Sequence, residues 1–192
     1  MSRLLICGFG PFPEAPDNPA ALAVERLRLD EWAPRGATID YAVAPTTWNG
    51  AAETASAAAR KLSADAVLLV GVAIQADAFR VETVARNRVG MGRLDAEGLP
   101  WPKAWIDPQG PAERCVTAPV QAMLAAIEAQ GLAAAASSDA GDYLCNFTLY
   151  RLLAEIPMTA FLHVPPLSAL LALDDILNAI RASAQALADN LV

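Results

Sequence analysis

Short apolar runs alternate with longer segments of helical pattern along this chain, and no other feature constrains its fold as strongly. The clearest run is 66-AVLLV-70, which is apolar at every position and is followed by Gly71. A strand without polar positions is typical of a parallel sheet that helices cover on both faces. The alternation therefore predicts an α/β fold, a three-layer α/β/α open sheet that is mostly parallel. Because one core commonly spans such a length, we expect residues 1–192 to form a single domain.

The elements can be placed from periodicity and from the residues that begin and end helices. Asn18-Pro19 predicts a helix start, because Asn caps free amides and Pro suits the first helical position; Gly131 predicts a helix end. Residues 77–89 suit extended structure, whereas residues 90–112 are rich in Gly, Pro and Trp and predict an irregular excursion. The predicted strands are 3–7, 38–42, 66–70, 132–137 and 159–164, and the predicted helices are 19–27, 50–62, 112–130, 143–155 and 171–187.

Composition excludes several classes of protein and of partner. Hydrophobic residues make up 55% and charged residues 18%, which excludes an intrinsically disordered chain. A net charge of −7 without a run of Lys or Arg argues against a nucleic-acid or anionic-membrane partner. The segment 1-MSRLLICGFGPF-12 has the pattern of a strand and not of a signal peptide, and the three cysteines form no CxxC pair. We therefore expect a cytoplasmic protein with reduced cysteines.

The glycine-rich segment 8-GFGPFP-13 follows the first predicted strand, where a dinucleotide-binding loop could lie. Such a loop needs a third glycine that opens a helix, so that backbone amides point at the pyrophosphate. Here Pro11 and Pro13 prevent an immediate helix and the third glycine is absent. We expect no cofactor, and interpret the segment as a strand-end loop that carries Phe9 and Phe12 towards a pocket.

The single histidine, His163, limits the chemistry available to one chain. It excludes a zinc site with several histidines, and any His-assisted catalysis must use it. Cys145 lies near the start of a predicted helix of about ten residues, roughly 15 Å long. The following strand returns over about five residues, roughly 16 Å, and ends at His163. The two lengths match, so Cys145 and His163 are expected at the same edge of the sheet, where a thiolate nucleophile and its base could meet.

Each of these residues also has a purely structural interpretation. Cys145 could be a small buried hydrophobic side chain, and His163 could simply end a strand. Glu82 could orient the imidazole, as a carboxylate does in such constellations, or could be a solvated partner of Arg80 or Arg86.

The other two cysteines are weaker nucleophile candidates. Cys7 lies in a predicted core strand, where a thiol is inert, and Cys115 lies in a predicted helix without a signal that brings His163 near it.

Taken together, these segments resemble the pyroglutamyl peptidases, the C15 family of cysteine peptidases. The resemblance rests mainly on two blocks, 137-SSDAGDYLCN-146 and 161-FLHVP-165, which are fairly specific in combination. Three further segments match in order along the chain: 8-GFGPF-12 with Asn18-Pro19, Pro45-Thr46, and Gly71 followed by 82-ETVARN-87. The matches run from the first predicted strand to the last, so they cover nearly the whole chain.

The resemblance implies a reaction and a role for each matching residue. Cys145 would be the nucleophile, His163 the general base and later acid, and Glu82 the group that orients the imidazole. The reaction would be hydrolysis of the amide bond after an N-terminal pyroglutamyl residue of a peptide or small amide, through a thioester. The resemblance also implies no cofactor or metal, a homo-oligomer, and a substrate pocket lined by Phe9, Phe12, Thr46, Tyr143 and Leu144.

Two loops depart from the family pattern near the expected pocket. The stretch 73-AIQA-76 replaces Ala-Gly-Gly-Arg, and 90-GMGRLDA-96 replaces Asp-Ala-Arg-Ile-Pro-Asp-Asn, so Arg93 matches the family arginine only if one residue is inserted. Two alternatives therefore stay open. The chain could be a Cys-His-Glu hydrolase of another small amide or acyl substrate, or a catalytically silent binding protein of the same fold.

Overall fold

Six strands form the central sheet of the computed structural model, which describes residues 2–191. Their order across the sheet is β2-β1-β3-β8-β4-β7, and the first four run parallel to one another. Strand β4 is antiparallel to β8, and β7 is parallel to β4, so the sheet is mostly parallel as predicted. The strands are β1 (Ser2–Phe9), β2 (Ala37–Ala44), β3 (Ala66–Val72), β4 (Phe79–Glu82), β7 (Ala134–Ser137) and β8 (Thr159–Val164).

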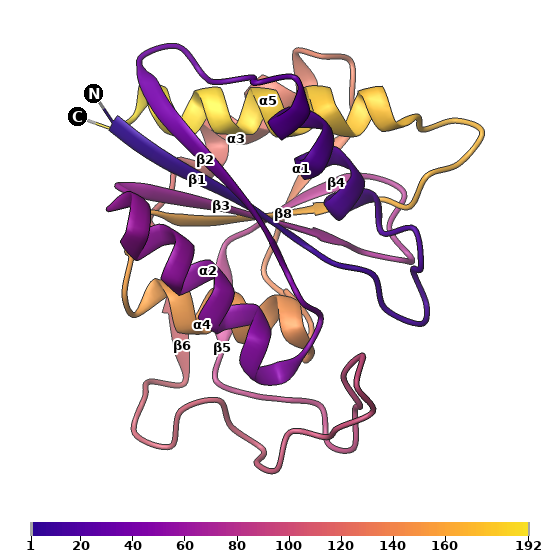
Figure 1. The fold of residues 1–192 in the computed structure, drawn as a ribbon, viewed down its shortest axis with the longest axis vertical. Helices are drawn as coiled ribbons and strands as arrows, with labels where there is room; N and C mark the ends of the chain where they lie inside the picture. Colours follow the sequence, from indigo (N-terminus) through magenta and orange to yellow (C-terminus); the bar gives the residue numbers. More distant parts are fainter. Residues whose placement is uncertain (1, 192) are drawn as a thin grey trace.

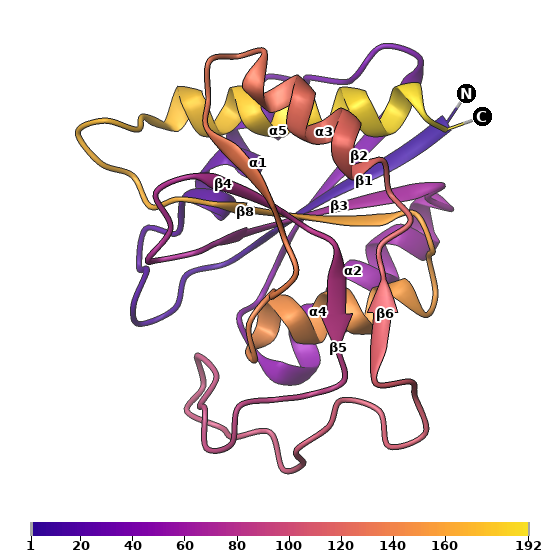
Figure 2. The same ribbon diagram turned by 180° about the vertical axis from the view of Figure 1, so that it is seen from behind.

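Helices cover both faces of this sheet. On one face lie α1 (Pro19–Leu29), α3 (Val120–Glu128) and α5 (Leu173–Asp189), and on the other lie α2 (Trp48–Leu62) and α4 (Leu144–Leu153) (Figures 1 and 2). The predicted three-layer α/β/α architecture is therefore confirmed. Among the residues that the structure describes, no helix combines the length and apolarity that a membrane crossing requires.

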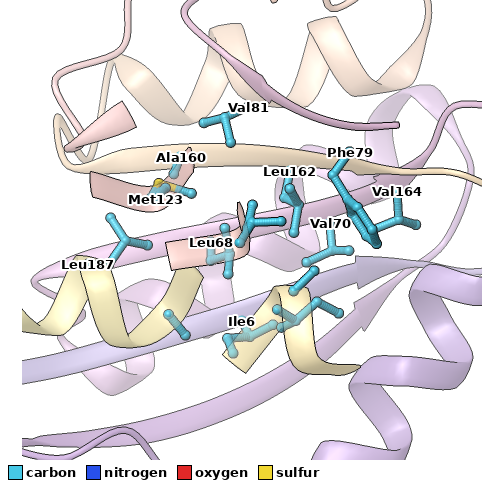
Figure 3. Close-up of a cluster of buried hydrophobic side chains, with 14 of the residues drawn as sticks. Ile6, Leu68, Val70, Phe79, Val81, Met123, Ala160, Leu162, Val164 and Leu187 are labelled. Carbon is cyan, nitrogen blue, oxygen red and sulfur yellow. The ribbon is translucent and has the colours of Figure 1, made fainter. Parts of the chain in front are cut away.

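The predicted core strand and the predicted helix start both form for the expected reasons. Every residue of β3 is buried, and its side chains alternate between the two helical layers. Figure 3 shows Leu68 and Val70 in a cluster of buried apolar side chains with Met123 of α3 and Leu187 of α5. At the start of α1, the Asn18 side-chain oxygen accepts a hydrogen bond from the amide of Ala20 at 3.0 Å, and Pro19 occupies the first turn.

The helix predicted over residues 112–130 is wrong in its first half. Residues Glu113–Cys115 instead form strand β6, which pairs antiparallel with β5 (Val84–Arg86) in a two-stranded ribbon beside α4. Arg86 and Glu113 form an ion pair at 3.0 Å across this ribbon. Helix α3 begins only after Pro119, because proline has no backbone N–H to donate to a hydrogen bond in a helix interior. Cys115 is therefore an exposed strand residue and not a helical one.

The excursion between β5 and β6 is irregular, as predicted, but two polar side chains, Asn87 and Asp95, hold it in place. The Asn87 side chain binds the backbone of Ile106, Asp107 and Gly110. The Asp95 carboxylate, only 6% exposed, accepts hydrogen bonds from three backbone amides: Trp48 at 3.1 Å, and Glu97 and Leu99 at 3.0 Å each. The loop that carries residues 90–99 is thereby attached to the first turn of α2.

Candidate active site

A buried carboxylate and the only imidazole of the chain meet between strands β4 and β8. Nδ1 of His163 lies 2.7 Å from Oε1 of Glu82, and the two residues are 7% and 0% exposed. A carboxylate without any exposure needs such a partner, because an isolated buried charge is very unfavourable. The interpretation of Glu82 as a solvated partner of an arginine is therefore wrong. Arg86 instead pairs with Glu113 and Asp139.

Cys145 lies beside this pair, in the first turn of helix α4. Its sulfur is 3.1 Å from the position that a Cβ on Gly71 would occupy, and Gly71 is paired in register with His163 across β3 and β8. Only the hydrogen of a glycine leaves the thiol enough room to lie over the strand at this point. The helix that leads away from Cys145 and the strand that returns to His163 do end at the same edge of the sheet, as their lengths predicted.

The two neighbours of His163 change its protonation. Burial by itself lowers the pKa of His163, but Coulombic attraction and hydrogen bonding from Cys145, together with those from Glu82, raise it from 6.5 to about 9. The imidazole is then protonated at neutral pH. Because Nδ1 is occupied by Glu82, the other ring nitrogen is left for the cysteine. A protonated imidazole beside a cysteine favours the thiolate, which is the nucleophilic form.

Cys145 opens into a cavity of about 800 Å³, within the range of small-molecule sites. The cavity is bounded by the loop after β3, by β4, by residues 93–94 and by the segment before α4. Its lining includes Phe12, Ala73, Arg80, Arg93, Tyr143 and Cys145. A smaller cavity of about 570 Å³ lies between α3 and α5, on the opposite helical layer, and none of these groups line it.

Comparison with known proteins identifies the family. The model of the pyroglutamyl peptidase family matches residues 2–187 of the chain. The chain belongs to the pyroglutamyl peptidase family. It is 32% identical over 183 residues to the pyrrolidone-carboxylate peptidase of Mycobacterium tuberculosis strain H37Rv, covering 91% of this chain and 82% of that protein. It is 31% identical over 202 residues to that of Streptococcus pyogenes serotype M12, covering 97% and 93%.

Solved structures of this family share the fold over nearly the whole chain. Pyroglutamyl peptidase I from Bacillus amyloliquefaciens superposes with a TM-score of 0.90 at 28% identity, covering 98% of this chain and 96% of that one. The pyrrolidone carboxyl peptidase of Thermococcus litoralis has the same TM-score at 24% identity, covering 100% and 95%, and supports the fold alone. As a pyroglutamyl peptidase family member, the chain is a hydrolase of the peptidase class.

The five residues that the family resemblance assigned to the pocket do not all face this cavity. Phe12 and Tyr143 line it. Phe9, Thr46 and Leu144 are buried and are absent from its lining in the described chain. The Phe9 ring packs on Phe161 at a centroid distance of 5.9 Å, and the Thr46 hydroxyl donates to the Gly10 carbonyl at 2.9 Å.

The two loops that depart from the family pattern both reach the cavity. Arg93 forms an ion pair with Asp142 at 3.2 Å and lies over the Tyr143 ring, 5.4 Å from its centroid. The Tyr143 hydroxyl donates to the Leu94 carbonyl at 3.0 Å. The segment that precedes Cys145 is therefore fastened to the loop of residues 90–99, and the ion pair supports the assignment of Arg93 to the rim of this cavity.

Sequence reasoning missed the hydrogen bonds of the Asn146 side chain and the tight packing at Gly71. The Asn146 side chain, 1% exposed, accepts from the Arg86 amide at 2.8 Å and donates to the carbonyls of Arg86 and Arg88. It thus joins the residue after Cys145 to strand β5. In the sequence, the only indication for Asn146 is its position directly after Cys145. For Gly71 the indication is a glycine within a core strand, which often marks a close approach of another group.

The remaining cysteines lie away from this arrangement. Cys7 is fully buried in β1, and burial raises the pKa of its thiol to about 12, so it stays protonated. Cys115 lies on the ribbon strand β6. Of the three cysteines, only Cys145 lies next to the imidazole.

Proposed function

We propose that this chain is a cysteine peptidase that hydrolyses the amide bond after an N-terminal pyroglutamyl residue, through a Cys145–His163–Glu82 triad. The observation that carries the proposal is a helix N-terminal cysteine that lies over Gly71, the strand partner of His163, while Nδ1 of His163 lies 2.7 Å from a fully buried carboxylate. Nucleophile, base and orienting group have this mutual arrangement in cysteine and serine hydrolases of unrelated folds.

The first half of the reaction forms an acyl-enzyme. The Cys145 thiolate attacks the carbonyl carbon of the pyroglutamyl residue, and the carbonyl electron pair moves to oxygen. When the tetrahedral intermediate collapses, the C–N bond breaks and the protonated His163 gives its proton to the departing amine. The product is a thioester between Cys145 and the pyroglutamyl group. Glu82 keeps the imidazole oriented and favours its charged form throughout.

The negative oxygen of the intermediate needs hydrogen-bond donors. The first turn of α4 supplies them, because Tyr143 at its N-cap makes no side-chain cap hydrogen bond and the turn's own amides lack helical acceptors. The backbone amide of Cys145 is the donor nearest to the nucleophile, and the positive end of the helix dipole acts in the same direction.

The second half releases the product. His163, now neutral, takes a proton from a water molecule that attacks the thioester carbonyl. The C–S bond breaks, pyroglutamate leaves, and the thiolate–imidazolium pair is restored. The uncharged lactam suits a cavity with aromatic walls such as Phe12 and Tyr143.

A fluorogenic pyroglutamyl amide tests the proposal. The wild-type protein should release the fluorophore, and Cys145→Ala should not. The matched control is Cys115→Ala, which removes an exposed thiol on strand β6 and should retain the wild-type rate. Equal rates for wild type and Cys145→Ala would contradict the proposed reaction.

Thiol labelling separates the two alternatives from this proposal. Alkylation of Cys145 that depends on His163, without pyroglutamyl cleavage, would indicate a hydrolase for another small amide or acyl substrate. Alkylation that rises only near the ordinary thiol pKa of about 8.5 would indicate a silent binding protein.

A further inference from the structure

We infer that Arg80 binds a carboxylate one residue beyond the scissile amide, so that the preferred substrates are pyroglutamyl dipeptides with a free C-terminal carboxylate. The inference rests on the proposed function and adds a substrate class to it. It assigns to Arg80 a role in specificity, distinct from the roles of the three residues that carry the reaction.

The sheet register places Arg80 next to the reacting groups. Arg80 of β4 is paired with His163 of β8 across the antiparallel part of the sheet, and such cross-strand partners have their side chains on the same face. Glu82 follows two residues later in β4 and shares that face. Glu82 is fully buried behind the imidazole, whereas Arg80 is half-buried and lines the cavity.

In the described chain, Arg80 forms no ion pair with the other charged side chains that line the cavity, so it can bind a charged ligand. Four of them line it: Glu14, Arg80, Arg93 and Asp142. Arg93 and Asp142 neutralise each other at 3.2 Å. Glu14 lies towards Tyr143, where its charge contributes to the raised pKa of that phenol. Within residues 2–191, Arg80 has no ion pair and no side-chain hydrogen bond, so its guanidinium is a cation in the cavity with unused donors.

The chemistry of a dipeptide fits this position. Once the pyroglutamyl carbonyl lies at Cys145, the C-terminal carboxylate of a dipeptide is one residue further on, about 3.5 Å along the chain. The planar guanidinium binds a carboxylate through two parallel hydrogen bonds, which recognise its shape as well as its charge. A longer peptide has a neutral amide at the same place and leaves those donors unmatched.

The direct experiment compares two pairs of substrates, and the members of each pair differ only in whether they carry one carboxylate or the corresponding amide. They are pyroglutamyl-alanine, its C-terminal amide, and pyroglutamyl-glutamate and pyroglutamyl-glutamine that are both amidated at the C-terminus. We expect kcat/KM for pyroglutamyl-alanine to exceed that for its amide by about tenfold, the lower end of what a charged hydrogen bond contributes. The ratio should shrink as ionic strength rises, because salt screens the interaction.

Variants then assign the preference to Arg80. Arg80→Gln should abolish the ratio between acid and amide, and Arg80→Lys should retain part of it through charge alone. The control is Arg60→Gln, on α2, whose guanidinium pairs with Glu155 and not with the cavity. It should retain the full ratio. If Arg80→Gln fails to fold, the Lys variant and the salt dependence of the wild-type ratio still test whether Arg80 binds the carboxylate.

The outcomes separate this inference from the function on which it rests. If the wild type cleaves none of the four substrates and no fluorogenic amide, the proposed function fails. If it cleaves acid and amide equally, or if the preference survives in Arg80→Gln, the role of Arg80 is overturned while the peptidase activity stands. A higher kcat/KM for the glutamate substrate than for the glutamine substrate, without a preference for pyroglutamyl-alanine over its amide, would overturn the dipeptide assignment. It would indicate that the cavity binds an acidic side chain of a longer peptide instead.

Discussion

The protonation of His163 is the property that a single measurement tests most directly. Its pKa of about 9, against an ordinary 6.5, corresponds to ~3 kcal/mol in favour of the imidazolium, since one pKa unit is about 1.4 kcal/mol. At pH 7.5 most of His163 is then protonated, whereas an ordinary histidine is mostly neutral. In the proposed mechanism, this imidazolium is the group that would stabilise a nucleophilic thiolate beside it.

The perturbation is Cys145→Ser, which keeps the size of the side chain but removes the thiolate. Cys145 contributes more than Glu82 to raising the pKa of His163, whereas burial opposes both. We therefore expect the pKa of His163 to fall by about one unit or more in this variant, the range of an opposite charge at close contact. Glu82→Gln should lower it too, but by less.

The assay is a pH titration of the imidazole resonance by NMR, with protein that carries no polyhistidine tag. Because the chain has one histidine, the signal needs no assignment. Cys115→Ser, in the exposed strand β6, is the matched control and should titrate as the wild type does. A wild-type midpoint near 6.5, or the same midpoint in all four proteins, would refute the reasoning.

Two further predictions concern the support of the site. Gly71→Ala introduces a Cβ 2.8 Å from Cζ of Phe161 and 3.1 Å from the Cys145 sulfur, so it should cost ~1–3 kcal/mol and lower Tm by about 2–4 °C per kcal/mol. Displacement of the thiol should lower kcat/KM about 100-fold, and wild-type values of both Tm and activity would contradict the close contact. Asp95→Ala leaves three backbone amides without their acceptor and should loosen the loop of residues 95–99 by ~2–3 kcal/mol, measured by amide hydrogen exchange. Asp95→Asn, which retains one side-chain oxygen, should loosen it less, and unchanged exchange in the Ala variant would contradict the proposed attachment to Trp48.

Local patterns predicted those elements whose own residues determine them. Strand β8 begins and ends where its apolar run does, and α1 begins at Asn18-Pro19 because the cap and the proline act within one turn. The same reasoning failed over residues 112–119. Helical propensity there is outweighed by pairing with β5, a segment 27 residues away, as the Arg86–Glu113 ion pair illustrates.

The residues of the pocket show the same contrast between what local patterns predict and what tertiary contacts determine. The resemblance named Thr46 for the pocket, but its hydroxyl is bound by the Gly10 carbonyl, a contact that depends on where β1 and β2 end relative to each other. Arg80 had no motif to mark it. Its place in the cavity follows from the position of β4 beside β8 in the sheet.

By itself, the sequence determined the α/β class, the start of α1, and the limitation of imidazole chemistry to His163. The match between the lengths of α4 and β8 also follows from the sequence, since rise per residue is a local property. The tertiary structure decided that Glu82 faces the imidazole and not an arginine, that Gly71 makes room for the sulfur, and that Arg80 lines the cavity. Those contacts join residues 74 to 83 positions apart and depend on strand β8 lying between β3 and β4, an order that no local periodicity encodes.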